Sequence, residues 1–215
     1  MTGVLRMLVW LLPPSRAKNA LLRALGHRVH PTARVGINLL LGVGAVEVGA
    51  ASFVGHGNVF RGLRSIRIGR EVIVGQFNWI TVAPSLTSVA QARMELGDHT
   101  VLTNRHYVDC SGGLLCDPYS TIGGVRSVVL SHSVDLGSGK QTLAPVVMKR
   151  HAFVATCCTV LPGVVLNERA VLAAGAVTVP GATYDAETLY GGVPAKPIGA
   201  IDGGYFHRTR TWIGL

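Results

Sequence analysis

The segment VVLSHSVDLGSG, from Val128 to Gly139, places His132 between two serines and directly after an apolar run. A histidine side chain titrates near neutral pH and can therefore act as a general base. Asp135 follows three residues later and is a candidate to orient the imidazole ring. The alternative is a solvent-facing loop histidine without a role. The choice between the two depends on the backbone that presents the ring.

Four cysteines offer a second possible chemistry: Cys110, Cys116, Cys157 and Cys158. They form no CxxC motif, and the adjacent pair at 157 and 158 is a poor candidate for a disulfide bond. We therefore expect reduced, buried thiols and a reducing, cytoplasmic compartment. A nucleophilic cysteine that forms a covalent intermediate is the alternative.

The composition limits the classes of partner. Of the 215 residues, 48% are hydrophobic and only 14% are charged, which argues against a disordered chain. The net charge of +9 favours an anionic partner, such as a phosphorylated cofactor, a nucleic acid or an acidic membrane surface. Lysine and arginine form no run of five, and only 6% of the residues are aromatic, so we expect no nucleic-acid partner.

The first 28 residues are predicted to form an amphipathic helical segment. An apolar run from Met7 to Leu12 ends at two prolines and is too short to span a bilayer. Ser15 is a suitable N-cap for a following helix, which Gly26 can end. Its apolar positions at helical spacing are Ala20, Leu21, Ala24 and Leu25. Residues 1–34 carry basic side chains and no acidic one, so the segment could rest on an anionic membrane face, cap the core, or do both.

From residue 35 onward, apolar side chains recur at every sixth position. The longest uninterrupted series is Met148, Val154, Val160, Leu166 and Leu172. Small or compact residues follow four positions after each member: Ala152, Cys158, Val164, Ala170 and Ala176. Shorter series are Val35 and Leu41; Val48 and Val54; Ile68, Val74 and Ile80; Leu96, Leu102 and Val108; and Cys116, Ile122 and Val128.

This spacing predicts a β-solenoid in which one strand and one corner take six residues, and three sides make a coil of about 18 residues. Every sixth side chain then points inward and stacks on its equivalent one coil away. A β-sandwich with glycine-rich turns is the alternative, but its strands alternate with a period of two and recur at about 8–12 residues. The spacing slips at several places, where loops should leave the coil. The slips lie near 45–48, 60–68, 80–96, 110–116 and 134–148.

The repeats resemble those of the hexapeptide-repeat acyltransferases, a family that includes sugar and exopolysaccharide O-acetyltransferases. The resemblance covers residues 29–200 and rests first on the recurring step of Leu, Ile or Val followed by Gly. The closing stretch VLAAGAVTVPGATYDAETLYGGVPAKPIG, from Val171 to Gly199, is similar to the terminal coil of that family. Ser131–His132, followed by a loop and by APVVM at 144–148, resembles its catalytic segment.

The resemblance implies an all-β fold, a left-handed parallel β-helix or hexapeptide-repeat solenoid with a short N-terminal helix. We expect residues 1–28 to form the helical segment, 29–200 the acyltransferase domain and 201–215 a C-terminal tail. The resemblance also implies a homotrimer, because packing flat sides around a threefold axis covers them and forms grooves between the subunits.

The implied activity is transfer of an acetyl or other acyl group from acetyl-CoA to a hydroxyl of a sugar or glycoconjugate, with His132 as the general base and no metal. Coenzyme A needs basic groups near its phosphates and small residues beside its pantetheine arm. The residues expected there are Lys149, Ala155, Ala173, Ala174 and Lys196. The residues expected in an acceptor pocket on the preceding coil are Asn104, His106 and Asp109.

Two other functions remain open at this point. A metalloenzyme of the gamma carbonic anhydrase kind has the same scaffold but needs three zinc-binding histidines, two of them closely spaced, and no H-x4-H motif is present. A non-catalytic solenoid that serves as an assembly module is the other. Binding of coenzyme A would separate the acyltransferase from both.

Overall fold

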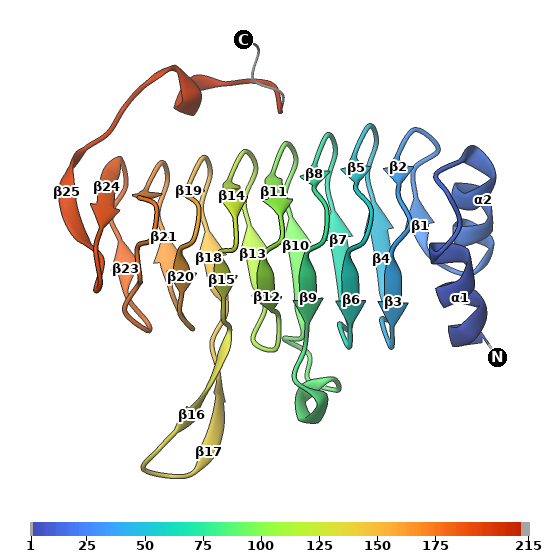
Figure 1. Cartoon of the computed structure of the whole chain (residues 1–215), viewed down its shortest axis with the longest axis horizontal. Helices are drawn as coiled ribbons and strands as arrows, with labels where there is room; N and C mark the ends of the chain where they lie inside the picture. Colours follow the sequence, from blue (N-terminus) through green and yellow to red (C-terminus); the bar gives the residue numbers. More distant parts are fainter. Residues whose placement is uncertain (1, 212–215) are drawn as a thin grey trace.

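Three parallel sheets form the sides of a three-sided prism, with two helices across its N-terminal end (Figure 1). The computed structural model describes residues 2–211. Met1 and residues 212–215, the last part of the expected C-terminal tail, lie outside the described residues. The two helices are α1 (Thr2–Trp10) and α2 (Arg16–Ala24), where the sequence predicted one.

Each of the first six coils contributes one strand to each sheet, as the solenoid hypothesis requires, and the last two contribute strands to sheets A and B only. Sheet A consists of β1 (Arg28–Val29), β4 (Ala45–Val48), β7 (Ser65–Ile68), β10 (Arg93–Leu96), β13 (Leu114–Cys116), β18 (Val146–Met148), β21 (Val165–Leu166) and β23 (Thr183–Tyr184). Sheet B consists of β2 (Arg34–Val35), β5 (Phe53–Val54), β8 (Ile73–Val74), β11 (Val101–Asn104), β14 (Thr121–Val125), β19 (Phe153–Val154), β22 (Val171–Leu172), β24 (Thr188–Gly191) and the antiparallel β25 (Lys196–Ala200). Sheet C consists of β3 (Leu39–Leu41), β6 (Val59–Arg61), β9 (Trp79–Thr81), β12 (Tyr107–Asp109), β15 (Val128–Val129) and β20 (Thr159–Val160).

The core is the stack of inward side chains that the six-residue spacing predicted. Met148, Val154, Leu166 and Leu172 are fully buried, and so are the small residues that follow them, such as Ala152. Val147 pairs with Val165 and Val165 with Thr183, which confirms a coil of 18 residues in this part of the chain. Continuous stacking of apolar residues supplies the main stabilisation, because the hydrophobic effect grows with the apolar area removed from water.

Two positions of the predicted series are wrong by one residue. Leu41 and Val128 do not point inward, and their neighbours Leu40 and Val129 are buried instead. In both cases the preceding corner has an unusual length. Only two residues separate Val35 from the buried Asn38, whereas the same corner one coil later has three. The corner before Val128 has one residue more, at the irregularity in β14.

The corners between the sheets define three edges of the prism, which we call the A/B, B/C and C/A edges after the sheets they join. A ladder of buried polar residues runs along the inside of the B/C edge. Its members are Asn38, Asn58, Asn78, His106, Ser127 and Cys158. Each side chain accepts a hydrogen bond from the backbone N–H of the next member, as in the 2.9 Å bond from the Asn78 amide to Asn58. The ladder therefore satisfies buried amide groups that the strands leave unpaired.

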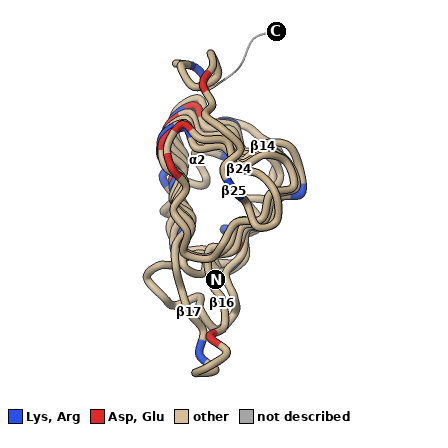
Figure 2. The backbone as a smooth tube through the Cα atoms, turned by 90° about the vertical axis from the view of Figure 1, so that its left-hand side faces the viewer, with Lys and Arg blue, Asp and Glu red and all other residues tan. Residues whose placement is uncertain are grey.

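Two excursions leave the prism, and both start at the C/A edge. The first, residues 82–92, contains a short 3-10 helix, η1 (Pro84–Leu86). The second is the antiparallel hairpin of β16 (His132–Asp135) and β17 (Lys140–Leu143). Both lie within regions where the six-residue spacing slips. Figure 2, which looks along the prism, shows the hairpin extending from one corner of the cross-section.

The N-terminal helices cover the open end of the first coil. The Ser15 side chain accepts from the Lys18 amide at 3.0 Å, as the N-cap prediction required. The predicted apolar face of α2 is wrong, because Leu21 is exposed and Leu22 is buried. The buried ammonium of Lys18 donates to three backbone carbonyls, and burial lowers its pKa to about 8. No helix within residues 2–211 is both long and apolar enough to cross a bilayer.

The chain after β25 returns over the A/B edge toward the middle of the prism (Figure 1). It contains a 3-10 helix, η2 (Gly204–His207), whose Tyr205 hydroxyl donates to Thr121 at 2.7 Å. Near its end Thr211 lies 3.0 Å from the His99 ring nitrogen Nδ1. This edge is remote from the hairpin, which leaves the opposite part of the cross-section (Figure 2).

Candidate active site

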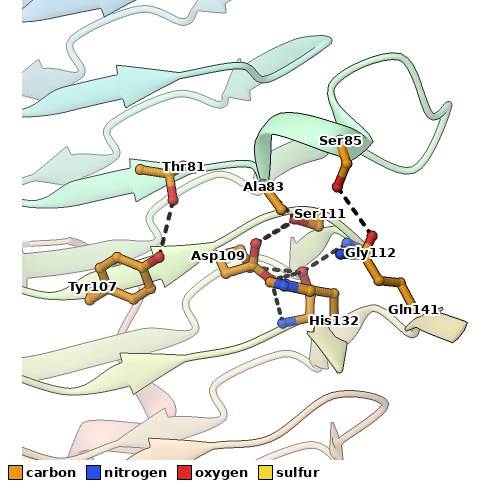
Figure 3. A network of polar contacts seen from close by, with 10 residues as sticks. Thr81, Ala83, Ser85, Tyr107, Asp109, Ser111, Gly112, His132 and Gln141 are labelled. Atoms are coloured by element: carbon orange, nitrogen blue, oxygen red, sulfur yellow. Dashed lines mark hydrogen bonds and ion pairs between the residues drawn. The ribbon is translucent and has the colours of Figure 1, made fainter. Parts of the chain in front are cut away.

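The base of the hairpin holds a histidine and a carboxylate in direct contact. His132, the first residue of β16, lies 2.7 Å through Nδ1 from Oδ2 of Asp109, the last residue of β12 (Figure 3). The side chain of His132 is 27% exposed, whereas that of Asp109 is 1% exposed. The ring is therefore accessible from solvent and is held from below by a buried anion.

Neighbouring residues fix the Asp109 carboxylate. The Ser111 hydroxyl donates to Oδ1 at 2.5 Å, and the backbone amide of Ser131 donates to Oδ2 at 2.9 Å. Ser111 in turn accepts from the backbone amide of Ala83 at 3.0 Å, which connects the pair to the first excursion. Each carboxylate oxygen thus has a donor besides the histidine, as a buried charge requires.

These contacts determine the charge of Asp109. Burial alone would raise the pKa of its carboxyl, but the hydrogen bonds from His132, Ser111 and Ser131 outweigh burial and hold the pKa below its usual value. An ionised carboxylate accepts only, so Nδ1 of His132 must donate to it. In the neutral ring the lone pair is then on Nε2, which makes no hydrogen bond within residues 2–211. A free Nε2 lone pair is what a general base needs.

The two excursions meet beside this ring. The hydroxyl of Ser85, the second residue of η1, donates to Oε1 of Gln141 in β17 at 3.2 Å (Figure 3). The contact ties loop 82–92 to the hairpin. The corner at Gly112 lies in the same network, and its amide donates to the Ser131 hydroxyl at 2.9 Å. An acceptor molecule would have to approach between the two excursions or along the prism surface.

Asp135 does not occupy the place expected of it beside His132. It pairs with Lys140 across the hairpin, is fully exposed, and accepts from the Ser138 amide at 2.8 Å. Its pKa is lowered first by that backbone hydrogen bond. Side chains alternate between the two faces of a strand, so residues three apart on β16 point to opposite sides. Asp109, expected in an acceptor pocket, contacts the ring instead.

The other residues expected in the acceptor pocket have structural contacts. His106 is 1% exposed and belongs to the polar ladder, where Nδ1 accepts from the Ser127 amide at 3.1 Å and Nε2 lies 2.9 Å from the Thr103 hydroxyl. Burial lowers the pKa of His106 to about 4, so the ring is neutral at pH 7. Asn104 is exposed on the B/C edge and accepts from the Gln76 amide at 2.7 Å. Neither side chain lies on the C/A edge, so one chain alone does not bring them to His132, and the acceptor pocket on the preceding coil stays a prediction.

The residues expected to hold coenzyme A lie on other edges of the prism than His132. Lys149 follows β18 on the A/B edge, 3.7 Å from the Asp117 carboxylate. Three alanines follow β19 and β22 on the B/C edge: Ala155, Ala173 and Ala174. Lys196 begins β25, beside β24 of sheet B, and is exposed. One chain alone therefore does not bring these residues to His132.

The cysteines and the metal-binding side chains add no second centre. All four cysteines are free, and only Cys157 is exposed. Burial raises the pKa of Cys110 and raises that of Cys116 to about 12, so neither is a thiolate at neutral pH. Among residues 2–211, no three His, Cys, Asp or Glu side chains lie close enough together to hold a metal ion.

Solved structures share this architecture. No protein-family model matches the sequence, and no curated protein matches it. The polysialic acid O-acetyltransferase OatWY superimposes with a TM-score of 0.57 at 12% identity, over 81% of this chain and 84% of that one. A variant of AntD, an N-acyltransferase from Bacillus cereus, gives 0.56 at 13% identity, over 86% and 89% of the two chains. The fold is that of the hexapeptide-repeat acyltransferases. The left-handed parallel β-helix expected from the sequence is thereby confirmed, and at such low identity the likeness concerns the fold.

The contact between Asp109 and His132 was not predicted, because the two residues are 23 positions apart in the sequence. In the structure Val108 pairs with Val129, so Asp109 lies directly under the residue that follows β15. An alignment of successive coils, three strands at a time, would have placed Asp109 opposite Leu130, two residues before His132. The signal was therefore present, but it was hidden by the extra residue in the corner after Ile122.

Proposed function

We propose that the protein transfers an acyl group from coenzyme A to a hydroxyl of a sugar or glycoconjugate, with His132 as the general base. The observation that carries the proposal is the 2.7 Å contact between His132 Nδ1 and the buried Asp109 carboxylate on a solvent-accessible corner. An alcohol is a poor nucleophile at neutral pH and needs such a base. A thioester is already activated, so no covalent enzyme intermediate is needed.

In the proposed reaction, Nε2 of His132 takes the proton of the acceptor hydroxyl as its oxygen attacks the thioester carbonyl. The carbon–sulfur bond of the tetrahedral intermediate then breaks, and the departing coenzyme A thiolate takes the proton from the imidazolium. Asp109 keeps the ring in the correct tautomer and stabilises the positive charge that forms on it, without itself accepting a proton. Asp109 is thus a positioning residue in this mechanism.

The proposed acyl donor is acetyl-CoA or a longer acyl-CoA. Support comes from the AntD structures, which contain coenzyme A together with dTDP or dTDP-4-amino-4,6-dideoxyglucose. The groove would include Lys149 and Lys196 for the phosphates and small alanines for the pantetheine arm. AntD is an N-acyltransferase, whereas OatWY is an O-acetyltransferase of polysialic acid. The two proteins together show that this fold can serve either an amine or a hydroxyl acceptor. We favour the hydroxyl because the His132–Asp109 pair supplies the base that a hydroxyl requires.

A homotrimer completes the proposed site. Because His132 is on the C/A edge and Ala173 and Ala174 are on the B/C edge, a groove containing both needs a second subunit. Packing two prisms side by side brings an edge of one against an edge of the next. We propose a cytoplasmic location for this assembly, since all four cysteines are free thiols.

The test combines binding and turnover in the purified full-length protein. Coenzyme A and acetyl-CoA should each raise the melting temperature, because a ligand of the folded state stabilises it by mass action. Mass spectrometry of acetyl-CoA reactions with a panel of sugar nucleotides and glycans should then find a product heavier by one acetyl group. Stabilisation by Zn²⁺ but not by coenzyme A would favour the metalloenzyme. If neither Zn²⁺ nor coenzyme A raises the melting temperature and no acceptor gives a product, the assembly module would be favoured.

A further inference from the structure

We propose that the N-terminal end of the prism docks on the surface of an anionic lipid bilayer through the outer face of α1. The first observation is that α1 is apolar on both of its sides. Its inner side packs Val9 and Trp10 on the prism, where Trp10 is 1% exposed and its ring centroid lies 6.1 Å from that of Phe60. A helix with apolar residues all round is normally buried on all sides.

The outer side of α1 and the turn after it nevertheless face solvent. The exposed residues are Val4 (61%), Leu5 (50%), Leu8 (51%), Leu11 (41%) and Leu12 (41%). Their spacing of three and four residues places them on one stripe along the helix. Figure 1 shows α1 at the end of the prism, with no strand beyond it to cover this stripe. Val9 and Trp10 anchor the helix on the prism. The helix therefore does not have to fold when the exposed stripe contacts a partner.

The charge of the N-terminal segment selects the partner. The first acidic residue of the chain is Glu47, and the preceding segment carries only basic side chains: Arg6, Arg16, Lys18, Arg23, Arg28 and Arg34. Of these, Arg16, Arg23 and Arg34 are exposed and form no ion pair within residues 2–211. A second copy of the chain packed on the same face would bring like charges together, whereas anionic headgroups attract them. An apolar helical face with nearby arginines is the pattern of helices that lie flat in the membrane interface.

The length of α1 decides between lying on a bilayer and crossing it. Nine residues of α-helix extend about 14 Å, roughly half the thickness of the hydrocarbon core. The helix therefore can insert its leucines among the acyl chains only from one side. Binding would combine burial of those leucines with attraction between the arginines and the headgroups, and it should weaken as salt screens the attraction.

The experiment measures co-sedimentation of the full-length protein with vesicles of phosphatidylcholine alone and of phosphatidylcholine mixed with phosphatidylglycerol. We expect binding to the mixed vesicles, weaker binding at high salt, and much weaker binding to phosphatidylcholine. The double variant Leu5→Gln/Leu8→Gln should reduce binding at least about tenfold, because both exposed leucines lose their apolar contact with lipid. Its melting temperature should match that of the parent, since neither side chain belongs to the core.

The matched control is Val134→Gln/Leu136→Gln, which changes the two exposed apolar residues of the hairpin and should leave binding unaltered. Equal binding to both kinds of vesicle, or unchanged binding by the Leu5→Gln/Leu8→Gln variant, would overturn the proposal. So would a mass in light scattering that this variant halves, because the face would then belong to a second copy of the assembly. Vesicle binding needs no substrate, so its outcome is independent of the proposed acyl transfer.

Discussion

The Asp109 carboxylate and the His132 imidazole belong to successive coils of the prism, and their 2.7 Å contact joins two segments 23 residues apart. The contact is supported by the scaffold, because Val108, next to Asp109, pairs in sheet C with Val129, three residues before His132. The candidate base is thus positioned by the scaffold, whereas the remainder of the hairpin extends away from it.

Removal of the imidazole should abolish most of the activity and leave the fold intact. His132→Gln keeps a polar side chain at a site that is only partly buried, so the melting temperature should change little. We expect turnover of acetyl-CoA with the preferred acceptor to fall by about 10²- to 10⁴-fold. Steady-state kinetics with circular dichroism on the same sample measure both quantities. A variant as active as the parent would disprove the role of His132 while leaving the fold unaffected.

Asp109→Asn should lower kcat through the ring rather than through substrate binding. An amide at this position no longer holds Nδ1–H and no longer stabilises the imidazolium, so kcat should drop by up to about 10⁴-fold with little change in KM.

Asp135→Asn is the matched control for that variant, because Asp135 is exposed on the hairpin and contacts Ser138 rather than the ring. Its kcat and KM should equal those of the parent. If Asp135→Asn lowers kcat and Asp109→Asn does not, the orienting carboxylate has been assigned to the wrong residue.

His106→Asn should make the fold less sensitive to acid. The buried His106 has its pKa lowered from 6.5 to about 4, so the unfolded chain binds the proton first as the pH falls. The parent should therefore have its full stability above pH 6.5 and lose roughly 3 kcal/mol through this group as the pH drops toward 4. Asparagine occupies the same place in the ladder one coil earlier, at Asn78, and has no such titration.

Denaturant unfolding of the His106→Asn variant at neutral and acidic pH tests this, with His30→Asn, at an exposed histidine, as the comparison. The activity of the His106→Asn variant at pH 7 should be retained, since both ring nitrogens have structural partners. A large loss of activity without loss of stability would return His106 to the acceptor pocket.

Mixed assemblies should recover activity from two inactive variants. If each site uses His132 of one subunit and Ala174 of its neighbour, then His132→Gln and Ala174→Trp remove different halves of the site. Co-assembly of the two in equal amounts should restore about one quarter of the intact sites, because each site needs one unaltered residue from each side. Two variants that stay inactive in a verified mixed trimer would show that one chain supplies the whole site.

The sequence predicted the fold because one physical requirement repeats along it. An inward apolar residue such as Val154 must stack on an equivalent residue one coil away. That requirement makes apolar residues recur at every sixth position of the sequence. The errors at Leu41 and Val128 arise where a corner gains or loses one residue, which no periodic pattern can report. The partner of His132 was misassigned for the same reason, since contact across coils depends on the lengths of all intervening corners.

One further consequence follows from the stacking of sheet C, in which β3, β6, β9, β12 and β15 are consecutive neighbours. Adjacent strands are about 4.8 Å apart, so His132 stands about 20 Å from the first coil, on which α1 packs. The number of coils therefore sets the distance between α1 and His132, in steps of one strand spacing. Insertion or deletion of one coil between β3 and β9 would move the His132 ring by one strand spacing and leave Asp109 and loop 82–92 beside it.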